Sequence, residues 1–190
     1  MSHHTIDRKP SGDEEGAYAV WATPSKDAKI RLKKLMSGLR SKFGGPKFDP
    51  HLTVVGPISL TGKDATEKFR AACRGLKVYP AQAQEISTGN SFWQSVYLRL
   101  DATPEVLGIS SHFDEHFGNT RTTPYLPHMS LLYGDLTDEE KNEAIDEAKT
   151  LDDTIDSMSF AIDRLELYIT PDDKTLKSWI KVEEYVLCAH

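Results

Sequence analysis

The chain has 190 residues, 38% of them hydrophobic and 27% charged, which is typical of one globular domain with a sizeable buried core. Its net charge of −6 argues against binding a long nucleic acid, because such binding needs an extended basic surface, whereas a small anion can still bind a locally positive pocket. No apolar run approaches the roughly 20 residues of a membrane span and the N-terminus lacks a signal-peptide core, so we expect a cytoplasmic protein with no membrane partner, acting as a monomer.

The first half of the chain reads as alternating strands and helices after a polar tail. Residues 1–15 are expected to be flexible, which leaves residues 16–190 as a single domain. Helical spacing of apolar residues and good N-caps predict the helices, and apolar runs between turn residues predict the strands. The expected elements are a strand at 18–22, a helix at 27–43, a strand at 48–56, a helix from Thr61 to Gly75, and strands at 78–88 and 94–100.

The second half follows the same order. Thr103 before Pro104 is a helix start, and Thr137 with Glu140 forms a capping box. The matching halves indicate an internal duplication and an α+β fold, in which two pseudo-symmetric lobes face one another, each with an antiparallel sheet and flanking helices. The expected elements are a helix at 104–117, a strand at 125–133, a helix from 137 to about 150, and strands at 157–169 and 176–187.

One short pattern occurs in both halves of the chain. Phe48-Asp49-Pro50-His51-Leu52-Thr53 returns 77 residues later as Tyr125-Leu126-Pro127-His128-Met129-Ser130. Alternate side chains of a strand point to the same face, so His51 shares a face with Thr53, and His128 shares one with Ser130. Each copy therefore places an imidazole beside a hydroxyl, and two facing lobes would bring both pairs into one cleft.

Two such pairs suit the hydrolysis of a phosphodiester. Histidine titrates near neutral pH, so one imidazole can take a proton from water while the other protonates the leaving oxygen. The hydroxyls of Thr53 and Ser130 can donate hydrogen bonds to the non-bridging oxygens as their negative charge grows. This scheme predicts a bell-shaped pH dependence with an optimum within about a unit of neutrality, and it does not reveal which histidine is the base.

Other chemistries have less support in the sequence. A zinc site would need a third protein ligand, and no H-E-x-x-H motif or cysteine pair supplies one, so we expect neither a metal nor a cofactor. His112 and His116 have metal-ligand spacing on a helix, but a solvated or half-buried helix face is the simpler interpretation. Cys73 and Cys188 are expected to be buried thiols, with a single bridge between them as the alternative.

On the basis of these motifs, the chain resembles members of the 2H phosphoesterase superfamily and, within it, the plant cyclic phosphodiesterases. His51-Leu52-Thr53 and His128-Met129-Ser130 match the paired H-x-T/S motifs of the superfamily. The similarity runs from about Tyr18 to Cys188. The flanking segments that narrow it to the plant enzymes are Tyr18-Ala19-Val20-Trp21, Phe48-Asp49-Pro50-His51, Ser87-Thr88-Gly89, Thr122-Thr123-Pro124-Tyr125 and Ser130-Leu131-Leu132-Tyr133.

The resemblance implies a bilobal fold with a cleft between two antiparallel sheets. It also implies metal-independent hydrolysis of ADP-ribose 1″,2″-cyclic phosphate to ADP-ribose 1″-phosphate, a late step in the disposal of tRNA-splicing by-products. Nucleoside 2′,3′-cyclic phosphates are implied as further substrates, opened to 2′-phosphates. The implied catalytic residues are His51 and His128, and the implied substrate-binding residues are Thr53, Ser130, Tyr133 and Trp21.

Some site residues and functions stay open at this level. Trp21 is equally well explained by core packing, and Phe92 and Trp93 are weaker candidates for stacking on a base. Arg121 could add positive charge, but an exposed arginine is the simpler expectation. The alternative functions are cleavage of RNA 2′,3′-cyclic ends or 2′-5′ linkages, and a nucleotide-binding module that has lost catalysis.

Overall fold

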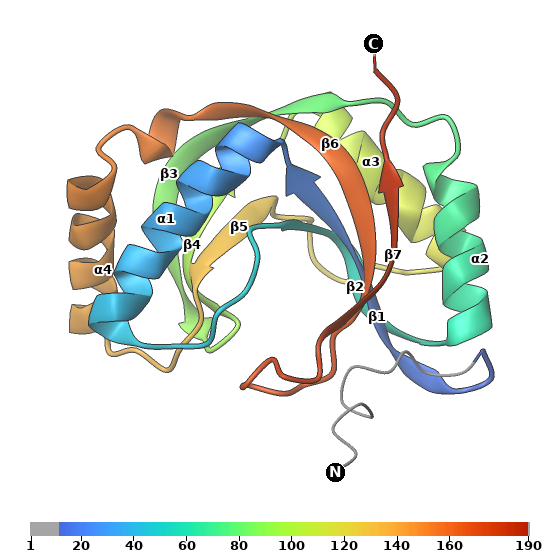
Figure 1. The fold of residues 1–190 in the computed structure, drawn as a ribbon, viewed down its shortest axis with the longest axis horizontal. Coiled ribbons are helices and arrows are strands. Elements are labelled where there is room, and N and C mark those ends of the chain that lie inside the picture. Colours follow the sequence, from blue (N-terminus) through green and yellow to red (C-terminus); the bar gives the residue numbers. More distant parts are fainter. Residues whose placement is uncertain (1–11, 190) are drawn as a thin grey trace.

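The computed structural model describes residues 12–189, which form an α+β fold of seven strands and four α-helices, with a short 3₁₀ turn at Ile155–Ser157 (Figure 1). The strands are β1 (Glu15–Pro24), β2 (Leu52–Thr61), β3 (Tyr79–Ser91), β4 (Gln94–Leu100), β5 (His128–Leu132), β6 (Ser159–Ile169) and β7 (Ile180–Val186). The helices are α1 (Lys26–Phe43), α2 (Gly62–Cys73), α3 (Pro104–Phe117) and α4 (Asp138–Leu151).

The predicted flexible tail falls mostly on residues 1–11, which lie outside the described residues. The last part of the predicted tail, from residue 12 on, is held to the domain by hydrogen bonds. The carbonyl groups of Gly12 and Glu14 accept hydrogen bonds from the backbone N–H groups of Lys63 and Gly62, both at 3.0 Å. These bonds satisfy donors that the first turn of α2 leaves without a helical partner.

The helices begin where the sequence predicts. Thr61, Thr103 and Thr137 each accept a hydrogen bond from a backbone N–H group in the first turn of α2, α3 and α4. The predicted capping box is present at α4, where the carboxylate of Glu140 also accepts from the N–H group of Thr137. Each such cap stabilises the fold by about 1 kcal/mol. No helix between residues 12 and 189 is long and apolar enough to cross a membrane.

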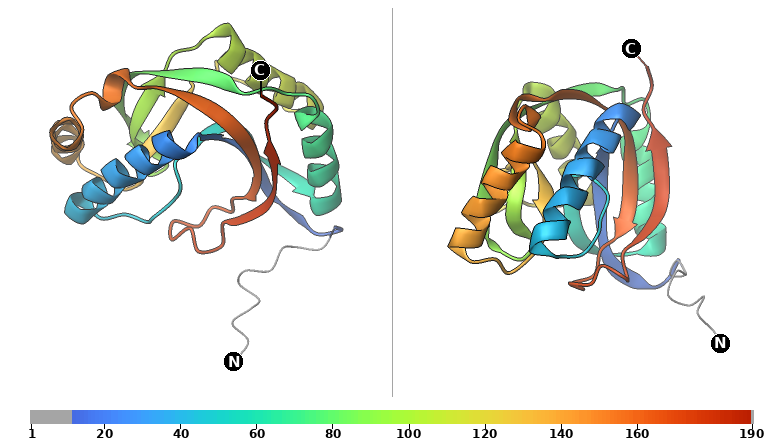
Figure 2. Two further views of the ribbon diagram at one scale, coloured as in Figure 1. Left: turned by 45° about the horizontal axis from the view of Figure 1, so that its top comes forward. Right: turned by 60° about the vertical axis from the view of Figure 1, so that its left-hand side comes forward.

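The predicted α+β class is confirmed, but the two expected sheets are joined. All seven strands form one antiparallel sheet in the order β1-β2-β5-β4-β3-β6-β7, and β6 also pairs with β1. The long strands β3 and β6 join the two sheets. The first residues of β3 pair with the first residues of β6, the rest of β3 pairs with β4, and the rest of β6 pairs with β1 and β7. The sheet therefore curves into an arch that connects both lobes (Figure 2).

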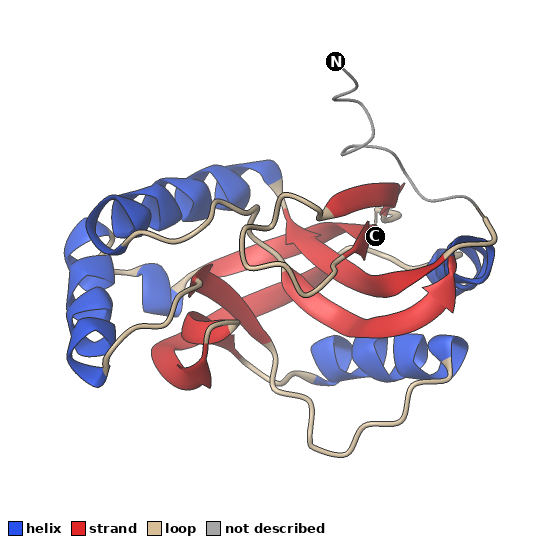
Figure 3. Cartoon of the chain, turned by 90° about the horizontal axis from the view of Figure 1, so that it is seen from below, coloured by secondary structure: helices blue, strands red, loops and turns tan. Residues whose placement is uncertain are grey.

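The lobes do not coincide with the two halves of the sequence. One arm of the arch contains β1, β2, β6 and β7, and the other contains β3, β4 and β5. The hairpin β3–β4 of the first half therefore lies beside β5 of the second half and, in exchange, the hairpin β6–β7 of the second half lies beside β1 of the first. Helices α2 and α3 pack together on one side of the molecule, and α1 and α4 pack together on the other (Figures 1 and 3). Each helix pair covers one arm and leaves the inner surface of the arch open for the site.

The strand that carries the first motif extends further than predicted. It was expected to end at Gly56, but β2 continues to Thr61 because residues 58–61 pair with the start of β1. The register of that pairing is irregular near Gly56, whose backbone has φ +104. A side chain there would bring its Cβ to 2.5 Å from the carbonyl oxygen of Tyr18, so only glycine fits this close approach.

The two cysteines are both free, so the alternative of a bridge does not apply. Cys73 is buried on α2, as expected, whereas Cys188 is exposed. The expectation that both thiols are buried is therefore wrong for Cys188. That residue follows the last strand, at a point where the chain is held by a backbone bridge to Lys77 and not by packing of its side chain.

Candidate active site

A cavity of about 520 Å³ lies on the inner surface of the arch, in the size range of small-molecule sites. All six residues that the sequence places in the site line this cavity: Trp21, His51, Thr53, His128, Ser130 and Tyr133. They come from β1, from the start of β2 and from β5 with the residue after it. The remaining lining residues are Ala17, Ala19, Gly56, Pro57, Trp93, Thr170, Pro171, Asp172 and Trp179.

The two motifs meet because β2 pairs with β5 at a single position. Leu52 lies opposite Met129 in this antiparallel pair, and both side chains are buried in the core. His51 and Thr53 flank Leu52, and His128 and Ser130 flank Met129, so this pairing brings both motifs to the same cavity.

The histidines are held in the same way in both copies. The Nδ1 atom of His51 lies 2.8 Å from the carbonyl oxygen of Asp49, and that of His128 lies 2.8 Å from the carbonyl oxygen of Leu126. A carbonyl oxygen only accepts, so Nδ1–H must be the donor in both rings. Each Nε2 is therefore the ring nitrogen that remains available, as acceptor in the neutral ring and as donor in the charged one.

Proline precedes each histidine and explains this hydrogen bond. Pro50 and Pro127 have no N–H group and disfavour a helical conformation of the residue before them. The chain therefore enters each strand extended, and the carbonyl group two residues before the histidine is left free to accept from its ring. The aromatic-x-Pro-His pattern in the sequence is thus a device that orients the imidazole.

Burial lowers the pKa of both histidines. His51 is 5% exposed, and desolvation lowers its pKa from 6.5 to about 4, because the loss of water outweighs the hydrogen bond to Asp49. The charge of His128 lowers the pKa of His51 further when both rings are protonated. Desolvation also lowers the pKa of the half-buried His128, against the hydrogen bond to Leu126. Of the two rings, His51 is the one more strongly held in the neutral form.

Trp21 serves the site through His51. Its indole lies parallel to the imidazole, with ring centroids 3.5 Å apart and planes 6° apart. Its other face is stacked on Tyr168, with centroids 3.8 Å apart. Both faces of the indole are covered by protein, so Trp21 presents only its edge to the cavity and cannot stack on a base. The predicted wall residue is present, but its closest partner is the histidine.

Tyr133 lies in an aromatic group at the mouth of the cavity. It stacks on Phe48 with centroids 4.0 Å apart and meets Trp93 edge to face at 5.3 Å. Burial raises the pKa of Tyr133, so its hydroxyl remains a neutral donor at neutral pH. Of the two weaker aromatic candidates, Trp93 lines the cavity and Phe92 does not.

Trp179 was missed by the sequence analysis. It belongs to the loop between β6 and β7, stacks on Trp93 at 5.5 Å and meets Trp21 edge to face at 5.6 Å. Its Nε1–H donates to the carbonyl oxygen of Pro171 at 2.9 Å, which fixes the ring across the loop. No local pattern marks this residue, because its role depends on the hairpin exchange that brings β6 and β7 to β1.

Thr170 and Asp172 were missed as well, at one end of the cavity. Asp172 is the only acidic side chain that lines it, and no lysine or arginine of the described residues does so. The hydroxyl of Thr170 is buried and has no hydrogen-bond partner. This end of the cavity therefore offers hydrogen-bond acceptors to a neutral part of a ligand and is unsuited to a second phosphate.

Three further candidates prove to be structural. Arg121 is exposed, as expected, and it pairs with Asp114 at 2.6 Å and donates to the carbonyl oxygen of Val54, so it supports α3. His112 bonds to the carbonyl oxygen of Ala72 and stacks edge to face on His116, at 4.5 Å. Within residues 12–189, no group of three or more His, Cys, Asp or Glu side chains is placed to hold a metal ion.

Comparison with known proteins places this site in a family. The model of the cyclic phosphodiesterase-like protein family matches residues 17–188. A cyclic phosphodiesterase of Arabidopsis thaliana is 47% identical over 167 residues, which cover 87% of this chain and 92% of that protein.

Solved structures share the fold at low sequence identity. Escherichia coli LigT complexed with 3′-AMP superposes with a TM-score of 0.62 at 11% identity, covering 92% of this chain and 99% of that one. LigT complexed with NADP+ gives a TM-score of 0.61 at 13% identity, with the same coverage of 92% and 99%. The family match and the 47% identity show that the chain belongs to the cyclic phosphodiesterases of the 2H phosphoesterase superfamily and is a phosphoric diester hydrolase.

Proposed function

We propose that the chain hydrolyses small cyclic phosphodiesters without a metal ion. Its substrates are ADP-ribose 1″,2″-cyclic phosphate, opened to ADP-ribose 1″-phosphate, and nucleoside 2′,3′-cyclic phosphates, opened to nucleoside 2′-phosphates. The cellular role that fits these reactions is the disposal of tRNA-splicing by-products. The observation that carries the proposal is the pairing of Leu52 with Met129, which brings two imidazole-hydroxyl pairs into one cavity.

The different burial of the two histidines suggests their roles. His51 is the better candidate for the general base, because a ring with a pKa of about 4 is neutral in nearly all molecules at neutral pH. Its Nε2 takes a proton from the attacking water as the new P–O bond forms. His128 is the less buried ring and is the better candidate for the acid, whose Nε2–H protonates the departing oxygen as the old P–O bond breaks.

The hydroxyls of Thr53 and Ser130 stabilise the charge that develops in this displacement. Both line the cavity beside the histidines, and short neutral donors suit a phosphodiester that carries only one negative charge. Ser130 makes a weak contact from Oγ to the carbonyl oxygen of Trp93, at 3.5 Å, and a side-chain hydrogen bond with Tyr133, which a phosphate oxygen can replace.

The lining of the cavity favours a small substrate over a long RNA. A long strand needs several basic residues along its path, and no lysine or arginine of the described residues lines the cavity. The solved LigT structures hold a mononucleotide and a dinucleotide, which are ligands of this size class.

Turnover of adenosine 2′,3′-cyclic phosphate and of ADP-ribose 1″,2″-cyclic phosphate in excess chelator tests the proposal. We expect both to be hydrolysed, with ³¹P NMR showing a 2′-phosphate and a 1″-phosphate as products. Absence of turnover with both substrates would leave a nucleotide-binding module, and a 3′-phosphate product would reverse the assigned leaving group.

A substrate whose leaving oxygen is replaced by sulfur tests the roles of the two histidines. A thiolate leaves without protonation, so this substrate should restore turnover to a variant that lacks the acid and not to one that lacks the base. We expect recovery with His128→Ala and none with His51→Ala. Recovery with His51→Ala alone would exchange the two roles.

A further inference from the structure

A second cavity of about 280 Å³ adjoins the catalytic cavity on the other side of Trp21. Trp21 and Trp179 line both spaces, so the two cavities are neighbours. The second cavity is lined by the aromatic rings of Phe48 and Tyr168 and by the side chains of Lys47 and Asp49. It therefore combines apolar walls with a lysine, and no lysine or arginine of the described residues lines the catalytic cavity.

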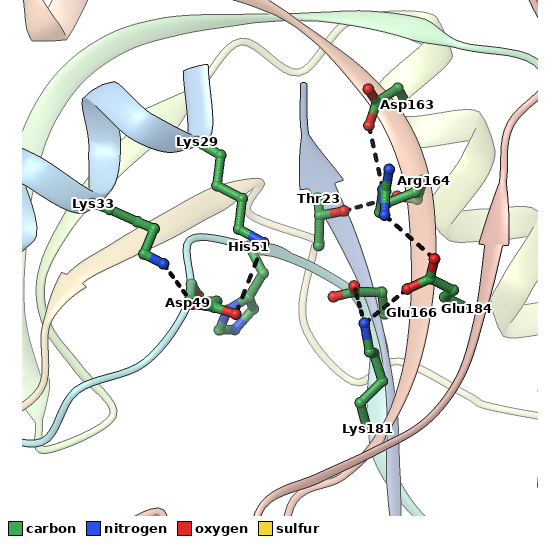
Figure 4. Close-up of polar contacts among 10 residues, drawn as sticks. All are labelled: Thr23, Lys29, Lys33, Asp49, His51, Asp163, Arg164, Glu166, Lys181 and Glu184. Atoms are coloured by element: carbon green, nitrogen blue, oxygen red, sulfur yellow. Dashed lines mark hydrogen bonds and ion pairs between the residues drawn. The ribbon is translucent and has the colours of Figure 1, made fainter. Parts of the chain in front are cut away.

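Two further lysines point toward this cavity from α1. Lys29 and Lys33 approach the carboxylate of Asp49, with N–O distances of 3.9 and 3.7 Å (Figure 4). Both pairs are long and partly exposed, so they contribute little to stability and can be exchanged for another anion. Lys47 lines the same cavity, and the three lysines together with Asp49 carry a net charge of +2.

The neighbouring acidic residues are already paired. Lys181 donates to Glu166 at 3.2 Å and to Glu184 at 2.7 Å, and Arg164 also pairs with Glu184 at 3.3 Å. Figure 4 shows this group on β6 and β7 together with Asp163, which lies 3.8 Å from Arg164. The hydrogen bond from Lys181 lowers the pKa of Glu184 and the charge of Lys29 lowers it further, so Lys29 acts on this group as well as on Asp49. The lysines that line or adjoin the second cavity are Lys47, Lys29 and Lys33.

We infer that this second cavity binds the diphosphate of a substrate whose cyclic phosphate is linked to a nucleoside diphosphate, as in ADP-ribose 1″,2″-cyclic phosphate. This inference rests on the proposed function and names the part of the chain that selects the larger substrate. A diphosphate brings two negative charges. The catalytic cavity is poorly suited to them, because no lysine or arginine of the described residues lines it and the carboxylate of Asp172 does. The three lysines match that charge, and the rings of Phe48 and Tyr168 provide apolar walls for the adjoining ribose.

The test compares two substrates in one charge variant. In Lys29→Gln/Lys33→Gln/Lys47→Gln, we expect the ratio of kcat/KM for ADP-ribose 1″,2″-cyclic phosphate to that for adenosine 2′,3′-cyclic phosphate to fall on the order of 10-fold. The matched control is Lys34→Gln/Lys63→Gln/Lys77→Gln, which removes the same charge from exposed positions outside both cavities. The control should leave the ratio unchanged.

Calorimetry with ADP-ribose and AMP separates the subsite from the catalytic function. ADP-ribose should bind the unaltered protein more tightly than AMP does, and the difference should disappear in the cavity variant and at high salt. An equal ratio in cavity variant and control, or equal affinity for the two ligands, would overturn the subsite while turnover of the small substrate still supports the proposed function. Loss of all turnover would overturn the proposed function, and calorimetry would still decide the subsite.

Discussion

The two histidine motifs have the same pattern and the same hydrogen bond but different surroundings. Each imidazole donates to the carbonyl oxygen two residues earlier at 2.8 Å. His51 is also stacked on Trp21 at 3.5 Å, whereas His128 meets Tyr97 edge to face with centroids 5.1 Å apart. A repeated motif thus sets the orientation of both rings, while the neighbouring strands give each ring its own degree of burial and hence its own pKa.

Removing either imidazole should lower activity more than any other change to the two motifs. We expect His51→Ala and His128→Ala each to lower kcat by about 10²–10⁴-fold, because each ring transfers a proton in the same displacement. The double variant should lose far less than the product of the two losses, since partners in one proton-transfer scheme are not additive. Steady-state kinetics on folded variants measures this, and near-normal turnover in either single variant would contradict the two-histidine mechanism.

Removing a hydroxyl should lower activity less than removing an imidazole does, and the two motifs should lose similar amounts. Thr53→Ala and Ser130→Ala should lower kcat by about 10²-fold with a smaller change in KM, because their hydroxyls meet charge that grows only toward the transition state. The comparison of kcat with KM decides the matter. A change confined to KM in both variants would show that these residues only hold the substrate.

Replacing Trp21 should lower activity through His51, on which it is stacked, and not through His128. Trp21→Leu should lower kcat about 10-fold with little change in KM, because His51 loses the flat surface that holds its ring in position. Trp21→Phe keeps an aromatic face and should recover part of the loss. Tyr97→Leu is the matched change beside His128, and we expect a smaller effect because that contact is edge to face.

Urea unfolding of the same variants checks that folding is intact. An equal loss of activity in Trp21→Leu and Tyr97→Leu, with equal losses of stability, would point to a general packing defect. The one-sided role assigned to Trp21 would then be wrong.

The pH profile should report the unequal burial. The active form has His51 neutral and His128 protonated, so activity is lost as pH falls through the pKa of His51, about 4, and as pH rises through the lowered pKa of His128. The optimum of kcat/KM should therefore lie on the acid side of 6.5, which revises the neutral optimum expected from unperturbed histidines. A bound phosphate stabilises both imidazolium forms and should move the kcat profile to higher pH. Coincident profiles centred at neutral pH would contradict the pKa shifts.

Chelation should produce no effect at all. Activity after dialysis against EDTA should equal that before it, because the two imidazoles and two hydroxyls supply the proton transfers and charge stabilisation themselves. Added zinc should not raise it. Loss of turnover on chelation that returned with zinc would show that a metal ion takes part in the reaction.

Much of this protein follows from local sequence signals. Four helices and three of their N-caps lie where the spacing of apolar residues and the threonines predict them. Four of the six proposed site residues follow from a repeated pattern on two strands, and the family resemblance supplies Trp21 and Tyr133; all six line one cavity. Periodicity and capping depend on residues close together in the chain, which is why they can be read from it.

The errors concern interactions between distant segments. The continuation of β2 beyond Gly56 depends on its pairing with the start of β1, and the exposure of Cys188 depends on how the chain ends beside Lys77. Trp179 and Asp172 reach the cavity only because β6 pairs with β1. None of these positions has a local pattern that distinguishes it from an ordinary strand or loop residue.

The sequence by itself determined the elements, the duplicated imidazole-hydroxyl motif and, through proline before each histidine, the orientation of both rings. Tertiary structure decided how those motifs are used. The single pairing of Leu52 with Met129 brings them into one cavity, and stacking on Trp21 makes His51 the more buried ring. The physical reason is that hydrogen bonds within a turn or strand depend on neighbouring residues, whereas strand pairing, burial and the charge around a cavity depend on segments that only folding brings together.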